Sequence, residues 1–161
     1  MGSFRQDVEA AIPALRRYAG ALLRNRQDVD DLVHDCLVQA LDRLHTRRSD
    51  ASMRAWLFAI MHNLYASRFR RKQPRMEETG LLDATKLPLA VHPRQEDQVQ
   101  VGDVMLAIQR LSVDFRAVLL LVAVEDLSYA EAAQVLNIPI GTVMSRLARA
   151  RESVRKDCET S

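Results

Sequence analysis

Apolar residues recur at helical spacing along most of this chain, and no segment sustains the apolar–polar alternation of a half-buried strand. The clearest case is one apolar stripe formed by Val29, Leu32, Val33, Cys36, Leu37, Ala40, Leu41 and Leu44. Acidic residues in Asp28–Asp31 stand at its start, where the helix dipole favours negative charge. Because Cys36 lies within the stripe, we expect it in the core rather than as a ligand or nucleophile. The pattern predicts an all-α protein.

Helical segments occur on both sides of a segment with a different composition. We expect one helix from about Phe4 to Arg24, bent or divided at Pro13, and another from about Ser52 to Lys72. From Gln73 to about Gln98 the chain has three prolines and several acidic residues, without a sustained helical stripe. This length exceeds an ordinary connection within a domain, so it predicts a flexible linker between two small helical domains.

Several short helices are expected after the linker. Apolar spacing marks two of them, at Val101, Val104, Met105, Ile108 and Leu111, and at Phe115, Val118, Leu119 and Val122. Ser128 and Glu131 then form a capping-box pattern, and Asn137 is suited to the left-handed end of that helix. After a turn over residues 138–141, a last helix is expected from about Thr142 to Lys156. Helix, tight turn and helix in this order predict a helix-turn-helix.

The last helix has two distinct faces when its residues are placed about 100° apart. Its core face is expected to consist of Val143, Leu147, Ala150 and Val154. Its outer face would carry Met144, Ser145, Ala148 and Arg149, with Arg146 and Arg151 on the flanks. Small residues between arginines suit a helix in the major groove, where guanidinium groups reach phosphates. The alternative is an arginine-rich surface helix with no ligand.

The helix near residues 52–72 has apolar side chains on two opposite faces. One face carries Met53, Trp56, Leu57, Ile60 and Leu64, and the other carries Phe58, His62, Tyr65 and Phe69. Aromatic rings beside cations can stack on unpaired bases. For Trp56 and Phe58 we favour burial in the middle of a domain instead. Better candidates for nucleic-acid contact are the polar residues, which seldom enter a core unpaired: His62, Asn63, Ser67, Arg68 and Arg71.

Charge is unevenly distributed, although the net charge is only +2. Residues 1–73 contain 13 basic and 8 acidic residues, residues 74–100 contain 3 and 5, and residues 101–161 contain 7 and 8. Within the last part, Thr142–Lys156 holds five basic residues and one acidic residue. Two basic patches around an acidic stretch indicate two contacts with one polyanion, although solvated helix faces would give similar clusters.

Other classes of protein are disfavoured by the sequence. No apolar run approaches the roughly 18–20 residues of a membrane helix, and Met1–Asp7 lacks the apolar core of a signal peptide. Cys36 and Cys158 do not form a CxxC pair, so we expect a reduced, cytoplasmic protein. Histidines and cysteines lack metal-ligand spacing, and there is no glycine-rich phosphate loop. We therefore predict no enzymatic activity, no metal and no cofactor.

Four segments together resemble extracytoplasmic-function (ECF) sigma factors of bacterial RNA polymerase. Asp28–Leu41 resembles their polymerase-binding helix, and Trp56–Asn63 followed by Arg68–Arg71 resembles their helix for the −10 promoter element. Leu127–Leu136 and Ile140–Arg151 resemble the two helices of their −35 helix-turn-helix. The resemblance covers nearly the whole chain in the right order, which makes it far more specific than a helix-turn-helix alone.

The resemblance implies a division of labour along the chain. Residues 1–73 would be the sigma region 2 bundle, 74–100 the linker, and 101–161 the sigma region 4 helix-turn-helix domain. Contacts with polymerase would come from Asp31, His34, Asp35 and Gln39. The −10 element would be bound by Asn63, Ser67, Arg68, Arg70 and Arg71, with His62 added from its polar character. The −35 element would be bound by Ser128, Thr142, Met144, Ser145, Arg146 and Arg149.

The family also implies promoter-specific initiation with the polymerase core enzyme and regulation by an anti-sigma factor. Asn63–Ser67 with its arginine-rich continuation resembles the alphaproteobacterial general stress response subgroup. Three positions depart from the usual pattern: His34 replaces Gln or Glu, Met144 replaces Lys or Arg, and Ser112 replaces Pro. Two other functions stay open, namely a DNA-binding regulator that acts without polymerase and a sigma-like decoy that sequesters an anti-sigma protein.

Overall fold

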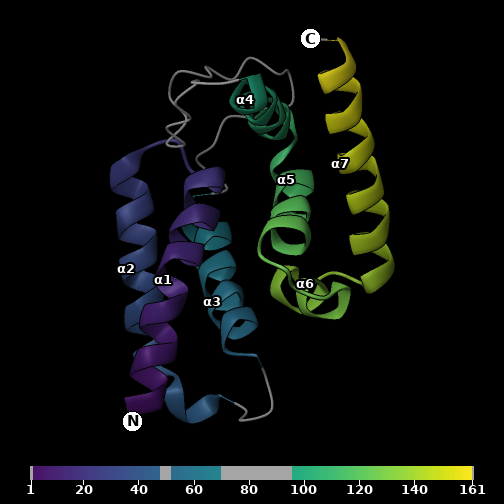
Figure 1. The fold of residues 1–161 in the computed structure, drawn as a ribbon. Helices are drawn as coiled ribbons and strands as arrows, with labels where there is room; N and C mark the ends of the chain where they lie inside the picture. The colour runs from purple at the N-terminus through teal and green to yellow at the C-terminus, as the bar shows by residue number, and fades with distance from the viewer. Residues whose placement is uncertain (1, 48–51, 70–95, 161) are drawn as a thin grey trace.

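The computed structural model describes residues 2–47, 52–69 and 96–160, and within these ranges it contains α-helices and no strand. The expected all-α class is therefore confirmed. The helices, which Figure 1 labels, are α1 (Gly2–Leu22), α2 (Arg26–Asp42), α3 (Met53–Arg68), α4 (Glu96–Arg110), α5 (Val113–Leu119), α6 (Tyr129–Leu136) and α7 (Ile140–Thr160).

The first three helices pack against one another as a bundle. Helix α1 runs through Pro13 without interruption, so the expected division of this helix is not seen. Helix α2 starts after Asn25, whose side chain accepts a hydrogen bond of 2.8 Å from the Gln27 backbone N–H. As expected, Cys36 is fully buried, and its thiol donates to the Leu57 carbonyl at 3.5 Å. Helix α3 is capped by Ser52, which accepts from the Ala55 backbone N–H.

The other four helices form a second group in which α7 contacts α4, α5 and α6. Helix α4 already begins at Glu96, inside the range expected to be linker, while residues 74–95 lie outside the described part of the chain. Ser112, which stands where the family usually has proline, accepts from the Phe115 backbone N–H and caps α5. The predicted capping box of Ser128 and Glu131 is present.

The ends of α6 and α7 follow from local hydrogen bonding. Asn137 ends α6 in the left-handed conformation with φ of 55°, as its side chain predicted. Helix α7 begins two residues earlier than expected, because the Pro139 carbonyl accepts from the backbone N–H groups of Thr142 and Val143. It continues to Thr160, four residues beyond the expected end.

A π-helical turn follows α5 and sets the direction of the chain. It spans Leu120–Val124, and the Glu125 backbone N–H donates to the Leu120 carbonyl at 2.9 Å. Asp126 then adopts a left-handed conformation with φ of 61°, which is uncommon outside glycine, asparagine and aspartate. Leu127 closes the turn by donating its N–H to the Leu121 carbonyl. This geometry directs the Glu125 side chain toward the first bundle, where its carboxylate binds Arg17 and Arg54.

The two groups of helices lie against each other in the described part of the chain. Helix α3 contacts α6 and helix α1 contacts α5, so the buried apolar residues form one continuous cluster from Ala11 to Ala150. Figure 1 shows α1, α2 and α3 on one side of this contact and α5 and α7 on the other. The sequence predicted two helical units but not that they would share an apolar core.

Candidate nucleic-acid interface

Helix α7 presents the two faces that its sequence predicted. Val143, Leu147 and Ala150 are at most 2% exposed and pack into the core, with Val154 half-buried below them. On the opposite face Met144 is 47% exposed, and Ser145, Ala148 and Arg149 are exposed beside it. Thr142 and Arg146 are half-buried at the edges, and Arg151 is exposed. The outer face is therefore open along its first three turns.

The hydroxyl groups at this surface also support the backbone. Ser145 Oγ donates to the Thr142 carbonyl at 3.2 Å, and Ser128 Oγ accepts from the Glu131 N–H at 3.0 Å. Ser128 is exposed at the start of α6, so its side chain both caps that helix and faces solvent. The helix-turn-helix surface is thereby fixed by local hydrogen bonds before any ligand is bound.

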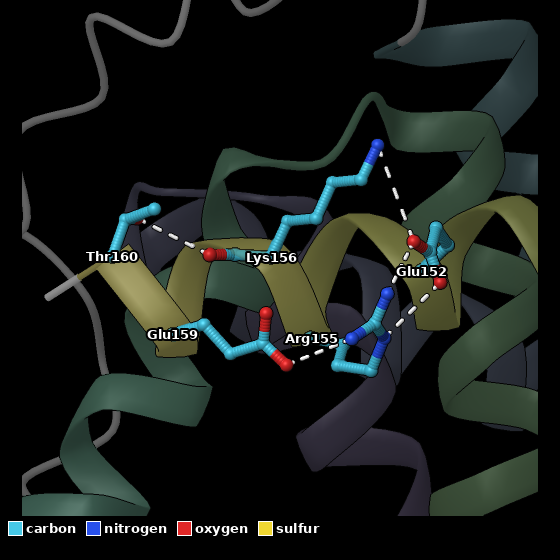
Figure 2. A network of polar contacts seen from close by, with 5 residues as sticks. All are labelled: Glu152, Arg155, Lys156, Glu159 and Thr160. Atoms are coloured by element: carbon cyan, nitrogen blue, oxygen red, sulfur yellow. Dashed lines mark hydrogen bonds and ion pairs between the residues drawn. The ribbon is translucent and has the colours of Figure 1, made fainter.

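In the second half of α7 the basic side chains pair with acidic side chains of the same helix. Figure 2 shows Arg155 between Glu152 and Glu159, with hydrogen bonds of 2.6 Å and 2.7 Å to these carboxylates, and Lys156 at 4.0 Å from Glu152. The hydrogen bonds raise the pKa of Arg155 and lower the pKa of Glu152. Because this part of the helix neutralises its own cations, the positive charge open to an outside anion is concentrated at Arg146–Arg151.

Helix α3 is buried on both faces, as the favoured interpretation of Phe58 predicted. His62 requires a correction, because it is only 7% exposed and shares a hydrogen bond of 3.0 Å between its Nδ1 and the Tyr18 hydroxyl. A polar group with a buried partner can enter a core, and the sequence did not reveal that Tyr18 would supply it. Trp56 is half-buried, with its ring edge-on to that of Phe4.

The end of α3 exposes the remaining candidates for −10 contact within the described residues. Asn63, Ser67 and Arg68 are exposed, whereas Arg70 and Arg71 lie outside the described residues. Ser67 Oγ donates to the Leu64 carbonyl at 3.1 Å. Arg68 forms an ion pair with Asp35 of α2, which joins the candidate −10 surface to the candidate polymerase surface.

Helix α2 exposes polar and apolar residues together. Asp31 and His34 are exposed, and Asp35 and Gln39 are half-buried. Leu41, which the apolar stripe placed in the core, is 64% exposed, and Val38 beside it is 45% exposed. Leu41 lies about 100° around the helix from Ala40, which is fully buried, so it falls at the edge of the stripe and points outward. The exposed apolar pair Val38 and Leu41 was therefore not predicted from the sequence.

Other kinds of site find no support within the described residues. No cluster of His, Cys, Asp or Glu there could hold a metal ion. None of the helices in those ranges is both long and apolar enough to cross a membrane.

The arrangement defines a class, that of DNA-binding helix-turn-helix proteins with a second helical bundle. Two family descriptions match the chain: the sigma2 domain of PhyR over residues 8–62, and sigma-70 region 4 over residues 102–154. A curated relative, the ECF RNA polymerase sigma factor EcfG of Rhodopseudomonas palustris, is 32% identical and covers 94% of this chain and 83% of its own length. The chain belongs to the ECF RNA polymerase sigma factors, a family of transcription factors rather than enzymes.

Two solved structures of protein complexes contain a chain with a similar fold. One is RpoE in complex with the anti-sigma factor NepR from Bartonella quintana, with 29% identity, a TM-score of 0.79, and coverage of 99% of this chain and 98% of RpoE. Another is CnrH with the cytosolic domain of CnrY, with 28% identity, a TM-score of 0.69, and coverage of 98% and 88%. The similarity to EcfG, RpoE and the PhyR domain agrees with the general stress response subgroup.

Proposed function

We propose that this chain binds the RNA polymerase core enzyme in the cytoplasm and directs it to promoters, without catalysing a reaction itself. The observation that carries the proposal is the outer face of α7, a helix-turn-helix surface with exposed arginines, in a chain that matches an ECF sigma factor over 94% of its length. In the proposed division, residues 1–73 bind polymerase and melted DNA, and residues 101–161 bind duplex DNA. Residues 74–100 are the linker between these two parts.

Polymerase docking is assigned to α2. Its exposed polar residues, Asp31 and His34, stand beside the half-buried Asp35 and Gln39, while Val38 and Leu41 offer apolar area on the same helix. An apolar pair surrounded by polar groups is typical of a protein–protein contact. This combination fits a protein partner better than a nucleic acid.

DNA contacts are assigned to two separate surfaces. Asn63, Ser67 and Arg68 would bind the −10 strand at the end of α3, together with Arg70 and Arg71. Met144 offers an apolar contact to a thymine methyl group, and Arg149 with the half-buried Arg146 would reach phosphates. Ser128, Thr142 and Ser145 would complete the −35 contact. With Met144 in place of a cation, this contact would depend more on shape and phosphates than on charged base recognition.

An anti-sigma factor is the proposed regulator. Support comes from the structures of RpoE with NepR and of CnrH with CnrY, both of which match nearly all of this chain. Because the match to RpoE includes both groups of helices at a TM-score of 0.79, their closed arrangement resembles that of a sigma factor held by its inhibitor.

Run-off transcription from a genomic library with purified polymerase core would test the function. We expect transcripts that depend on this protein and share two upstream elements, and a protein that does not bind core would refute the proposal. His34→Ala combined with Gln39→Ala should weaken core binding. His45→Ala, an exposed histidine in the short helical turn after α2, is the matched control and should not.

Binding measurements beside the transcription assay separate the two alternative functions. A polymerase-independent regulator would bind duplex promoter DNA tightly by itself and gain nothing from core. A decoy would bind an anti-sigma protein with unchanged affinity after Arg146→Ala and Arg149→Ala, and it would start no transcription.

A further inference from the structure

Glu125 is a carboxylate buried at the contact between the two groups of helices. Its side chain is 1% exposed, and both of its oxygens bind arginines of the first bundle. Arg17 Nε donates to Oε1 at 2.9 Å and its terminal nitrogen donates to Oε2 at 3.1 Å. Arg54 donates to Oε2 at 2.8 Å. A buried carboxylate is costly unless it is paired, and here its arginine partners lie 108 and 71 residues away in sequence.

Both arginines lie along a groove of the first bundle, and Arg54 also contacts an aromatic ring there. Arg54 lies over the ring of Phe58 with its guanidinium carbon 6.0 Å from the ring centre. Arg17 and Arg54 come from α1 and α3 and line an open groove of about 600 Å³ together with Met53 and Asp7. Their side chains remain about half exposed, whereas that of Glu125 is not. Separation of the two groups would therefore expose the Glu125 side chain to water, whereas the exposure of the two arginines would change less.

A second polar contact joins the two groups nearby. Arg116 of α5 is 2% exposed and donates to the carbonyl of Ala21 at 2.6 Å. Ala21 lies in the last turn of α1, where carbonyl groups lack helical partners and the helix dipole favours a cation. Both polar contacts therefore hold α1 against the segment that runs from α5 into the π-helical turn.

The closed arrangement is incompatible with simultaneous contact to both promoter elements. Elements near −10 and −35 are about 25 base pairs apart, which is about 85 Å of duplex at about 3.4 Å per base pair. In this structure α3 packs directly against α6 of the helix-turn-helix. The two surfaces must therefore separate before both elements can be bound.

We propose that Glu125, Arg17 and Arg54 form an interdomain clasp that keeps the chain in a closed state unable to engage a promoter. The effect of the clasp on transcription rests on the proposed function, whereas the clasp itself is a property of the isolated chain. Breaking the clasp raises the fraction of chains in the open state. The apparent affinity for any partner that needs the open state rises by the same factor as that fraction.

Small-angle X-ray scattering of the full chain tests the clasp without polymerase. A closed chain of 161 residues should have a radius of gyration of about 15 Å. Glu125→Gln, and separately Arg17→Gln with Arg54→Gln, should raise this radius while far-UV circular dichroism stays unchanged. Glu152→Gln is the matched control, because it removes a carboxylate bound by an arginine on the outer surface of α7 (Figure 2). A wild-type radius well above 15 Å, or variants as compact as the control, would overturn the proposal.

Combining the substitutions guards against a variant that simply unfolds. If the three residues act as one clasp, adding Glu125→Gln to the Arg17→Gln and Arg54→Gln chain should open it little further, whereas additive effects would refute the clasp. In transcription, Glu125→Gln should lower the protein concentration for half-maximal initiation roughly tenfold, as expected for losing hydrogen bonds to a charged group. If the wild-type protein never initiates transcription, the proposed function is refuted. The scattering measurements would still show whether the clasp exists.

Discussion

The hydroxyl of Tyr18 on α1 lies 3.0 Å from Nδ1 of His62 on α3, and both side chains are buried. Burial raises the pKa of Tyr18, so its hydroxyl stays protonated and can donate a hydrogen bond to the imidazole. The Tyr18 ring also lies edge-on to Phe58 at 5.3 Å between ring centres. A histidine that resembles a nucleic-acid contact in sequence thus helps to join α1 to α3.

Removing this hydroxyl should destabilise the protein. Tyr18→Phe deprives the buried imidazole of this partner, so we expect the free energy of unfolding to fall by about 1–2 kcal/mol in urea titrations. Tyr129→Phe is the control, because that ring is 37% exposed at the start of α6 and should change stability by less than about 0.5 kcal/mol. Equal losses in the two variants would contradict the role given to Tyr18.

The two cysteines should differ in reactivity. Burial raises the pKa of Cys36 to about 12, whereas Cys158 is half-buried near the end of α7. Because the thiolate is the nucleophile, one thiol per folded chain should react with a thiol reagent at about pH 8. Cys158→Ser should abolish that fast reaction, and fast labelling of Cys36 would contradict the packing described for α2.

Alkaline pH should weaken the fold through the same cysteine. The unfolded chain loses the Cys36 proton near pH 9, while the folded chain keeps it up to about pH 12. Above pH 9 the unfolded state therefore binds fewer protons, and the contribution of this group to stability declines as pH rises toward 12. Urea titrations from pH 8 to 11 should show that decline to be smaller in Cys36→Ala than in the wild-type protein.

The end of α6 should tolerate glycine but not alanine at position 137. Asn137 has φ of 55°, a conformation that asparagine and glycine accept and alanine does not. We expect Asn137→Ala to lower the free energy of unfolding by about 1 kcal/mol, and Asn137→Gly to leave it nearly unchanged. Thermal unfolding measures both, and identical losses would show that the side chain rather than the backbone matters.

Arginines in the two halves of α7 should contribute differently to DNA binding. Arg149→Ala should weaken promoter binding by the holoenzyme and reduce the slope of its salt dependence by about one, as expected for one lost phosphate contact. Arg155→Ala is matched in residue type and helix, but Arg155 already pairs with Glu152 and Glu159. Its loss should leave the salt slope unchanged, and equal slopes for both variants would contradict the assignment.

Local patterns in the sequence predicted much of this fold. The core face of α7, the capping box at Ser128 and the left-handed Asn137 all depend on neighbours within a few residues, so spacing and side-chain chemistry were sufficient. The residues proposed for polymerase and DNA contact came from family resemblance and exposed polarity, and they stay predictions until the variants above are measured.

Long-range partners could not be predicted in this way. Glu125 stands in the sequence as the first of two adjacent acids after an apolar run, and nothing near it identifies Arg17 or Arg54 as its partners. The same holds for His62 and Tyr18, which are 44 residues apart. Leu41 shows the opposite error, since helical spacing assigned to the core a side chain that the bundle leaves outside.

The π-helical turn at Leu120–Val124 makes the chain sensitive to insertion and deletion at one place. Such a turn holds one residue more than an α-helix of the same rise, so deleting a residue there would restore regular α-helix. Every later side chain would then rotate by about 100° relative to α5, and Glu125 would no longer face the arginines of α1 and α3. A relative one residue shorter in this segment could keep its helix-turn-helix intact, yet it would have to hold its two halves together by other means.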